Sequence, residues 1–99
     1  MIESVATVPT DRPERYLKQL ISHLGTQIDA EKSEDGHSGT LIFSAGSCAL
    51  TAEPGKLHMT ARAQDPERLA AVEDVVARHL VRFGEKEALT VEWSGAVGS

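Results

Sequence analysis

The stretch from Asp65 to Trp93 constrains this chain most, because it joins the longest helical periodicity in the sequence to a short alternating segment. Asp65 is a good N-cap, and Pro66 suits the first helical position, where its missing N–H costs nothing. Apolar residues then recur at helical spacing up to residue 83, and Gly84 can end a helix in the left-handed conformation. Apolar and polar residues alternate over 89–93, which predicts a half-buried strand.

The residues before this stretch predict a second helix and five more strands. The helix has Thr10 or Asp11 as its N-cap, contains Pro13 in its first turn and ends at Gly25. The strands show alternating apolar residues and are separated by turn signals such as Glu53-Pro54-Gly55: residues 2–8, 27–32, 40–44, 47–52 and 56–63.

The element order is therefore β-α-β-β-β-β-α-β. Each helix has one apolar stripe and most strands have one apolar face, so we expect an α+β fold. It has an antiparallel sheet of about six strands with two helices on one face, as in the TATA-binding-protein-like (TBP-like) class. We assign residues 1–94 to a single domain and residues 95–99 to a flexible tail.

Composition excludes some classes of function. The chain has 99 residues and a net charge of −5, which disfavours general binding of nucleic acid phosphates. Its one cysteine, Cys48, cannot form an intrachain disulfide and suits a reducing compartment. The first residues lack the pattern of a signal peptide, and no apolar run approaches the length of a membrane span. We therefore expect a cytoplasmic protein that does not insert into membranes.

Histidines and the cysteine are the side chains best suited to chemistry. His23 and His79 each lie near the end of a predicted helix, where a charged histidine favours the helix dipole. Alternatively, both converge with Cys48 on a ligand or metal. Cys48 has the inward phase of its strand, which favours a small buried hydrophobe. His37 and His58 are expected in a loop and on a solvated face.

Established motifs are absent from the sequence. No pair of ligands has zinc-motif spacing, the acidic loop near residue 34 does not fit calcium, and there is no nucleophile elbow or glycine-rich phosphate loop. The sequence identifies no cofactor and no metal site, and it favours a non-enzymatic protein.

Three motifs in order resemble DUF2218, a bacterial family of domains of unknown function, over roughly Val5 to Trp93. They are Arg15-Tyr16-Leu17-x-x-Leu20-x-x-His23, then Gly46-x-Cys48-x-Leu50-x-Ala52, then His79-Leu80-x-Arg82-Phe83 followed by Glu87, Leu89 and Trp93. Family members often carry a second histidine and a lysine where this chain has Thr26 and Gln27. The resemblance implies a small cytosolic domain without an established activity. It also implies a link to siderophore-interacting flavin reductases.

Three functions follow as hypotheses. The first is an accessory or binding domain, linked through its family to iron or siderophore metabolism, with a flavin reductase as partner. The second is a small enzyme or metal-binding protein that uses His23, His79 and Cys48 with Arg15, Arg82 or Glu87. The third is a homodimer formed through the open sheet face or an edge strand. The candidate ligand-binding residues are these six side chains.

Overall fold

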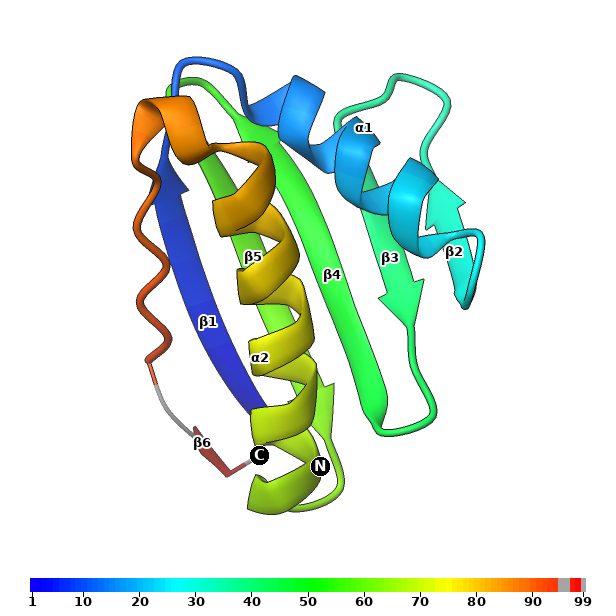
Figure 1. The fold of residues 1–99 in the computed structure, drawn as a ribbon. Helices are drawn as coiled ribbons and strands as arrows, with labels where there is room; N and C mark the ends of the chain where they lie inside the picture. Colours follow the sequence, from blue (N-terminus) through cyan, green and yellow to red (C-terminus); the bar gives the residue numbers. More distant parts are fainter. Residues whose placement is uncertain (95–96, 99) are drawn as a thin grey trace.

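The structure, a computed structural model, describes residues 1–94 and 97–98 of the chain. Its sheet has the strand order β2-β3-β4-β5-β1-β6, and every neighbouring pair is antiparallel (Figure 1). The elements are β1 (Ile2–Pro9), α1 (Pro13–Leu24), β2 (Asp29–Lys32), β3 (Ser38–Ile42), β4 (Gly46–Glu53), β5 (Lys56–Ala63), α2 (Pro66–Phe83), a short 3-10 helix η1 (Glu85–Glu87) and β6 (Val97–Gly98). The predicted α+β class with an antiparallel sheet and two helices is confirmed.

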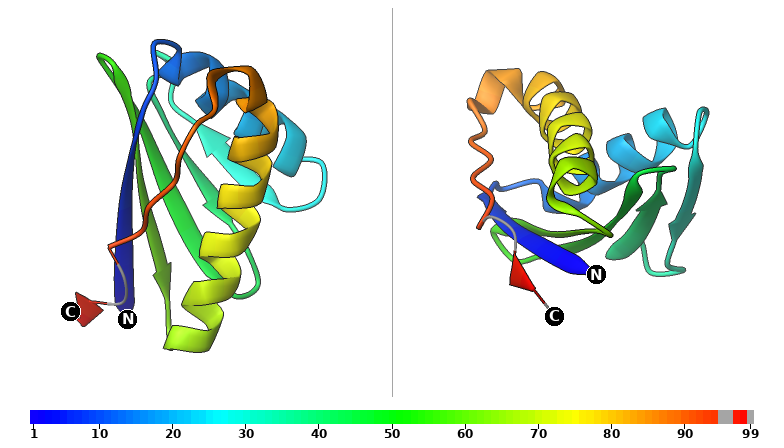
Figure 2. Two further views of the ribbon diagram at one scale, coloured as in Figure 1. Left: turned by 60° about the vertical axis from the view of Figure 1, so that its left-hand side comes forward. Right: turned by 90° about the horizontal axis from the view of Figure 1, so that it is seen from below.

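Both helices lie on the same face of the curved sheet (Figure 2). Each helix buries the apolar stripe that its sequence predicted, because only that stripe can replace water by contact with the sheet. The buried residues of α1 are Pro13, Tyr16, Leu17, Leu20 and Leu24, and those of α2 are Leu69, Val72, Val76 and Leu80.

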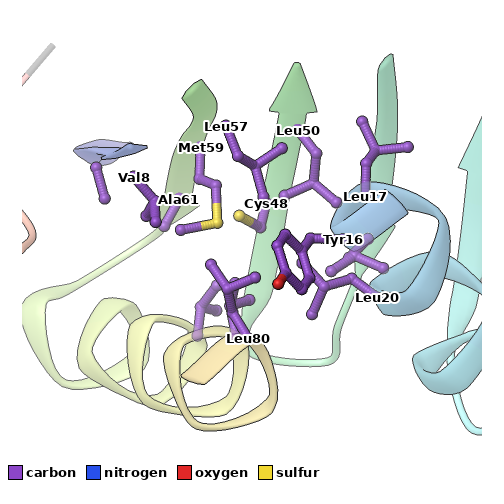
Figure 3. Close-up of a cluster of buried hydrophobic side chains, with 14 of the residues drawn as sticks. Val8, Tyr16, Leu17, Leu20, Cys48, Leu50, Leu57, Met59, Ala61 and Leu80 are labelled. Carbon is purple, nitrogen blue, oxygen red and sulfur yellow. The ribbon is translucent and has the colours of Figure 1, made fainter. Parts of the chain in front are cut away.

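The core lies between this helical layer and the inner face of β4 and β5. Leu50 and Met59 are buried there, as the strand alternation predicted. Cys48 is fully buried in the same core cluster (Figure 3). Burial raises the pKa of the Cys48 thiol to about 12, because the charged thiolate loses its hydration. The prediction of a buried, hydrophobic cysteine is therefore confirmed.

The N-caps of the two helices differ. Asp65 caps α2 as predicted, since its side chain accepts a hydrogen bond of 2.8 Å from the backbone N–H of Arg68. The predicted cap of α1 by Thr10 or Asp11 is wrong: the N-cap residue is Arg12, and no side chain among the described residues caps the helix. The Thr10 hydroxyl instead accepts from the Arg12 backbone N–H at 3.1 Å, two residues along the chain. The first turn of α1 therefore keeps its uncapped N–H groups.

The predicted strand over residues 89–93 is wrong, although its alternation is correct. Leu89 is buried and Val91 and Trp93 are half-buried, whereas the residues between them are exposed. The segment has no strand assignment and runs beside β1 (Figures 1 and 2). Ser94 then makes a backbone hydrogen bond of 2.8 Å to Val5. A two-residue period in the sequence indicates only that one side of the segment is buried. Here that side packs against the core, although the segment forms no hydrogen-bonded ladder.

Gly84 and Ala88 set the path of the chain after α2. Gly84 is not left-handed as predicted, since its φ is −99°, and Ala88 carries the positive φ of 52° instead. Gly84 is needed for close approach, because a Cβ there would overlap the side chain of Leu89. Leu89 thus packs directly against the end of α2.

Two remaining expectations concern the tail and membranes. Residues 95, 96 and 99 of the predicted tail lie outside the described residues, and residues 97–98 form β6 beside Ile2 and Glu3. No helix in the described part of the chain is long and apolar enough to span a bilayer.

Gly84→Ala is expected to lower the free energy of unfolding by about 1–3 kcal/mol, because the new Cβ overpacks the buried Leu89. Urea denaturation measures this cost. In a Leu89→Ala background the same change is expected to be nearly neutral, because no long side chain remains to overlap. An equal cost in both backgrounds would contradict the assigned contact.

Cys48→Ala is expected to reveal an alkaline loss of stability in the wild-type chain. Between the ordinary thiol pKa of 9.0 and the folded value of about 12, the unfolded chain releases a proton that the folded chain retains. The free energy of unfolding therefore falls as pH rises, by about 1.4 kcal/mol between pH 8 and pH 10. Urea denaturation of both proteins at these two pH values measures the difference, which the alanine variant lacks. A stability difference that is the same at both values would show that the thiol is not protected.

Candidate functional site

A hollow of about 640 Å³ lies where the end of α2 and η1 meet the beginning of α1. These segments lie at the same end of the molecule (Figures 1 and 2). We call this feature the charged hollow, and its lining residues are Asp11, Arg12, Arg15, Tyr16, Arg82, Phe83, Glu85, Lys86 and Glu87. The lining holds four cations and three carboxylates, so it is slightly positive on a chain whose net charge is −5.

The cations of the charged hollow have no carboxylate partner within the described residues. Of the ten Lys and Arg residues in the chain, four form ion pairs with carboxylates: Lys56, Arg62, Arg68 and Arg78. The other six have no ion pair in the part of the chain that the structure describes, and four of those six line the charged hollow: Arg12, Arg15, Arg82 and Lys86. Guanidinium groups present planar N–H donors that match carboxylate and phosphate oxygens. The hollow therefore offers donors for an anion.

Two hydroxyl groups donate hydrogen bonds to the carboxylate of Glu87. The buried Tyr16 hydroxyl donates to Glu87 Oε2, and the Thr10 hydroxyl donates to Oε1 at 3.3 Å. These hydrogen bonds fix η1 to the start of α1. They also engage both oxygens of Glu87, which forms no ion pair with the arginines among the described residues.

The direction of α1 adds positive potential to the same place. Arg12 and Arg15 lie at its N-terminal end, where aligned peptide dipoles leave a partial positive charge. No described side chain caps this end, and Glu14 of the first turn points its carboxylate to His37, at 3.2 Å. The dipole therefore supplements the side-chain cations.

Three rings form a second feature beside the charged hollow. The ring centroids of His23 and His79 are 5.2 Å apart, and that of Phe83 lies 5.4 Å from His23 and 6.3 Å from His79. We call His23, His79 and Phe83 the ring cluster. His79 Nδ1 lies 2.7 Å from the carbonyl oxygen of Val75. Because a carbonyl oxygen can only accept a hydrogen bond, Nδ1 carries a proton and donates it to this contact.

Shared residues connect the ring cluster to the charged hollow. Phe83 lines the charged hollow and also a second hollow of about 470 Å³, together with Lys18, Gln19, Ser22, His23 and Thr26. Arg82 lines the charged hollow and also a third hollow, of about 360 Å³, with Arg78 and His79. The three hollows thus meet at the last two residues of α2.

Five of the six candidate residues from the sequence lie around this junction. Arg15, Arg82 and Glu87 line the charged hollow, whereas His23 and His79 belong to the ring cluster. The sixth, Cys48, lies in the core and is fully buried. The other two histidines lie elsewhere. His37 is paired with Glu14, and His58 contacts the hydroxyl of Thr7 on β1.

The proposed combination of two histidines and a cysteine is not brought together. Among the described residues, no three His, Cys, Asp or Glu side chains gather closely enough to hold a metal ion. His79 also shares its hollow with Arg82, which has no ion pair among the described residues and whose charge repels a cation. The local electrostatics favour an anion.

Sequence reasoning missed Arg12 and Lys86 of the charged hollow, and also the hydrogen bonds that Thr10 and Tyr16 donate to Glu87. A spacing of three between Arg12 and Arg15 was a signal for one basic face at a helix start. No signal in the sequence links those residues to Lys86, because their proximity depends on how the helices pack.

Comparison with known proteins places the chain in a family. The family model described as "Uncharacterized protein conserved in bacteria (DUF2218)" matches residues 5–94. A similar solved structure is titled "NMR structure of PA4090 from Pseudomonas aeruginosa"; it shares 31% sequence identity, the match covers 95% of this chain and 96% of that chain, and the TM-score is 0.79. A search of curated proteins finds no match. The chain therefore belongs to the DUF2218 family, as its three sequence motifs indicated.

Proposed function

We propose that this protein is a binding domain for a small anionic ligand, a carboxylate or a phosphate, held in the charged hollow. The observation that carries this proposal is that, of the six cations without an ion pair among the described residues, four line one hollow. Exposed cations cost little when solvated, so their grouping is not needed for folding. A bound anion would supply their counter-charge.

The roles of the side chains follow from their chemistry. Arg15 and Arg82 come from different helices, so a bound anion would bridge α1 and α2 through their N–H donors. Lys86 supplies a mobile point charge, and the uncapped start of α1 adds a fixed dipole. Glu87 positions η1 through its two hydroxyl partners.

This geometry supports binding better than catalysis or metal coordination through His23, His79 and Cys48. The cysteine is buried with a protonated thiol, so it offers neither a nucleophile nor a metal ligand. We infer a TBP-like fold class from the order of strands β1 to β5 and the two helices. A cytoplasmic location, a homodimer, and a link to iron or siderophore metabolism through a flavin reductase stay predictions from the sequence and the family resemblance.

Inorganic phosphate is expected to bind in the millimolar to micromolar range and to shift the backbone amide NMR signals of residues 10–16 and 82–87. Arg15→Gln and Arg82→Gln are each expected to weaken binding about tenfold, because each removes a charge-assisted donor pair. Added sodium chloride is expected to weaken binding further through screening.

Arg62→Gln is the matched control, since it removes the same charge from a residue that is ion-paired with Glu3 on β1. It is expected to leave the dissociation constant within about twofold of the wild-type value. Shifts scattered over the surface, or an equal loss in the Arg62 variant, would refute the proposed site.

A further inference from the structure

Phe83, which lines two hollows, indicates the chemical character of the part of the ligand that lies beyond its anionic group. This inference rests on the proposed function. Phe83 is half-buried at the last position of α2 and lines both the charged hollow and the second hollow. The second hollow has a different chemical character: Lys18 is its only permanently charged lining residue among those described, and the rings of His23 and Phe83 supply aromatic surface. One site therefore joins a cationic part to an aromatic part.

We propose that the ligand is an aromatic anion, an aryl phosphate or an aryl carboxylate. Its anionic group would lie against Arg15 and Arg82, and its ring would pack against Phe83 and the imidazole of His23. An inorganic anion satisfies only the cationic part and leaves the aromatic surface in contact with water. An aromatic ring attached to the anionic group would cover that surface and lie against Phe83.

The ring cluster has a geometry that accepts another ring. His23 meets Phe83 at an interplanar angle of 79°, and His79 meets it at 56°, so the three rings are edge-on or tilted and do not stack face to face. Aromatic pairs favour such edge and offset arrangements. His23 is exposed and the other two rings are half-buried, so ring surface remains open to solvent.

Size and charge agree with this ligand class. The charged hollow of about 640 Å³ and the second hollow of about 470 Å³ both fall within the range of small-molecule sites. Lys18 and Arg82, which have no ion pair among the described residues, add positive charge around the ring cluster, which disfavours a cationic ring and favours an anionic one.

The test compares two probes with the same anionic group, methyl phosphate and phenyl phosphate, by NMR titration of the full chain. Wild-type protein is expected to bind phenyl phosphate about tenfold more tightly than methyl phosphate. Phe83→Leu is expected to reduce this preference, taken as the ratio of the two dissociation constants, to about twofold. Phe83→Tyr, which keeps the ring, is expected to retain the preference.

Phe43→Leu is the matched control, since Phe43 is the other phenylalanine of the chain and is also half-buried. It is expected to keep the full preference for phenyl phosphate. If both probes bind equally well to the wild-type chain, or if Phe43→Leu and Phe83→Leu lose the preference equally, the aromatic inference is wrong and the proposed anion site stands. If neither probe binds, the proposed function itself is wrong.

Discussion

Burial of two apolar helix stripes on one face of the sheet is the interaction on which the rest of this structure depends. Leu17 and Leu20 of α1 and Val76 and Leu80 of α2 are completely buried. Each such side chain contributes about 1.5–3 kcal/mol on burial, which far exceeds any surface ion pair. Because both apolar stripes are buried against the same face of the sheet, the two helices lie next to each other. The beginning of α1 and the end of α2 then meet, and the charged hollow forms at that junction.

The hydroxyl contacts of Glu87 decide the electrostatics of this junction. Tyr16 is buried by the same packing that seats α1, and its hydroxyl is thereby presented to η1. With Thr10 on the other oxygen, the carboxylate is satisfied without a guanidinium partner. Arg15 and Arg82 have no carboxylate partner among the described residues, so their donors are open to the proposed ligand. A local positive region on an acidic protein attracts anions over about a Debye length, roughly 8–10 Å, which supports the proposed recognition of an anion.

The second helix and the segment after it show where sequence patterns succeed and fail. Asp65 caps α2 because capping is a local interaction between a side chain and the next turn. The alternation over residues 89–93 correctly gives the buried side but not the strand, since a ladder also requires a partner in register. The close approach of Leu89 to Gly84 takes the chain past β1 without such pairing.

The candidate residues divide in the same way. The inward phase of Cys48 on its strand correctly indicated a core position, because side-chain direction alternates along any strand. The sequence allowed His23 and His79 either a helix-dipole role or convergence with Cys48; the two rings do lie together, with centroids 5.2 Å apart, but Cys48 is in the core.

The sequence by itself determined the two helices, five of the strands and the class of the fold, because periodicity acts within a few residues, and its three motifs indicated the family. Only the tertiary structure decided that Arg12 and Arg15 lie beside Arg82 and Lys86. Charged surface residues contribute little to stability, so their positions leave no periodic trace in the sequence. Their meeting depends on where two distant helix ends come to rest on the sheet, and hydrophobic packing fixes that place.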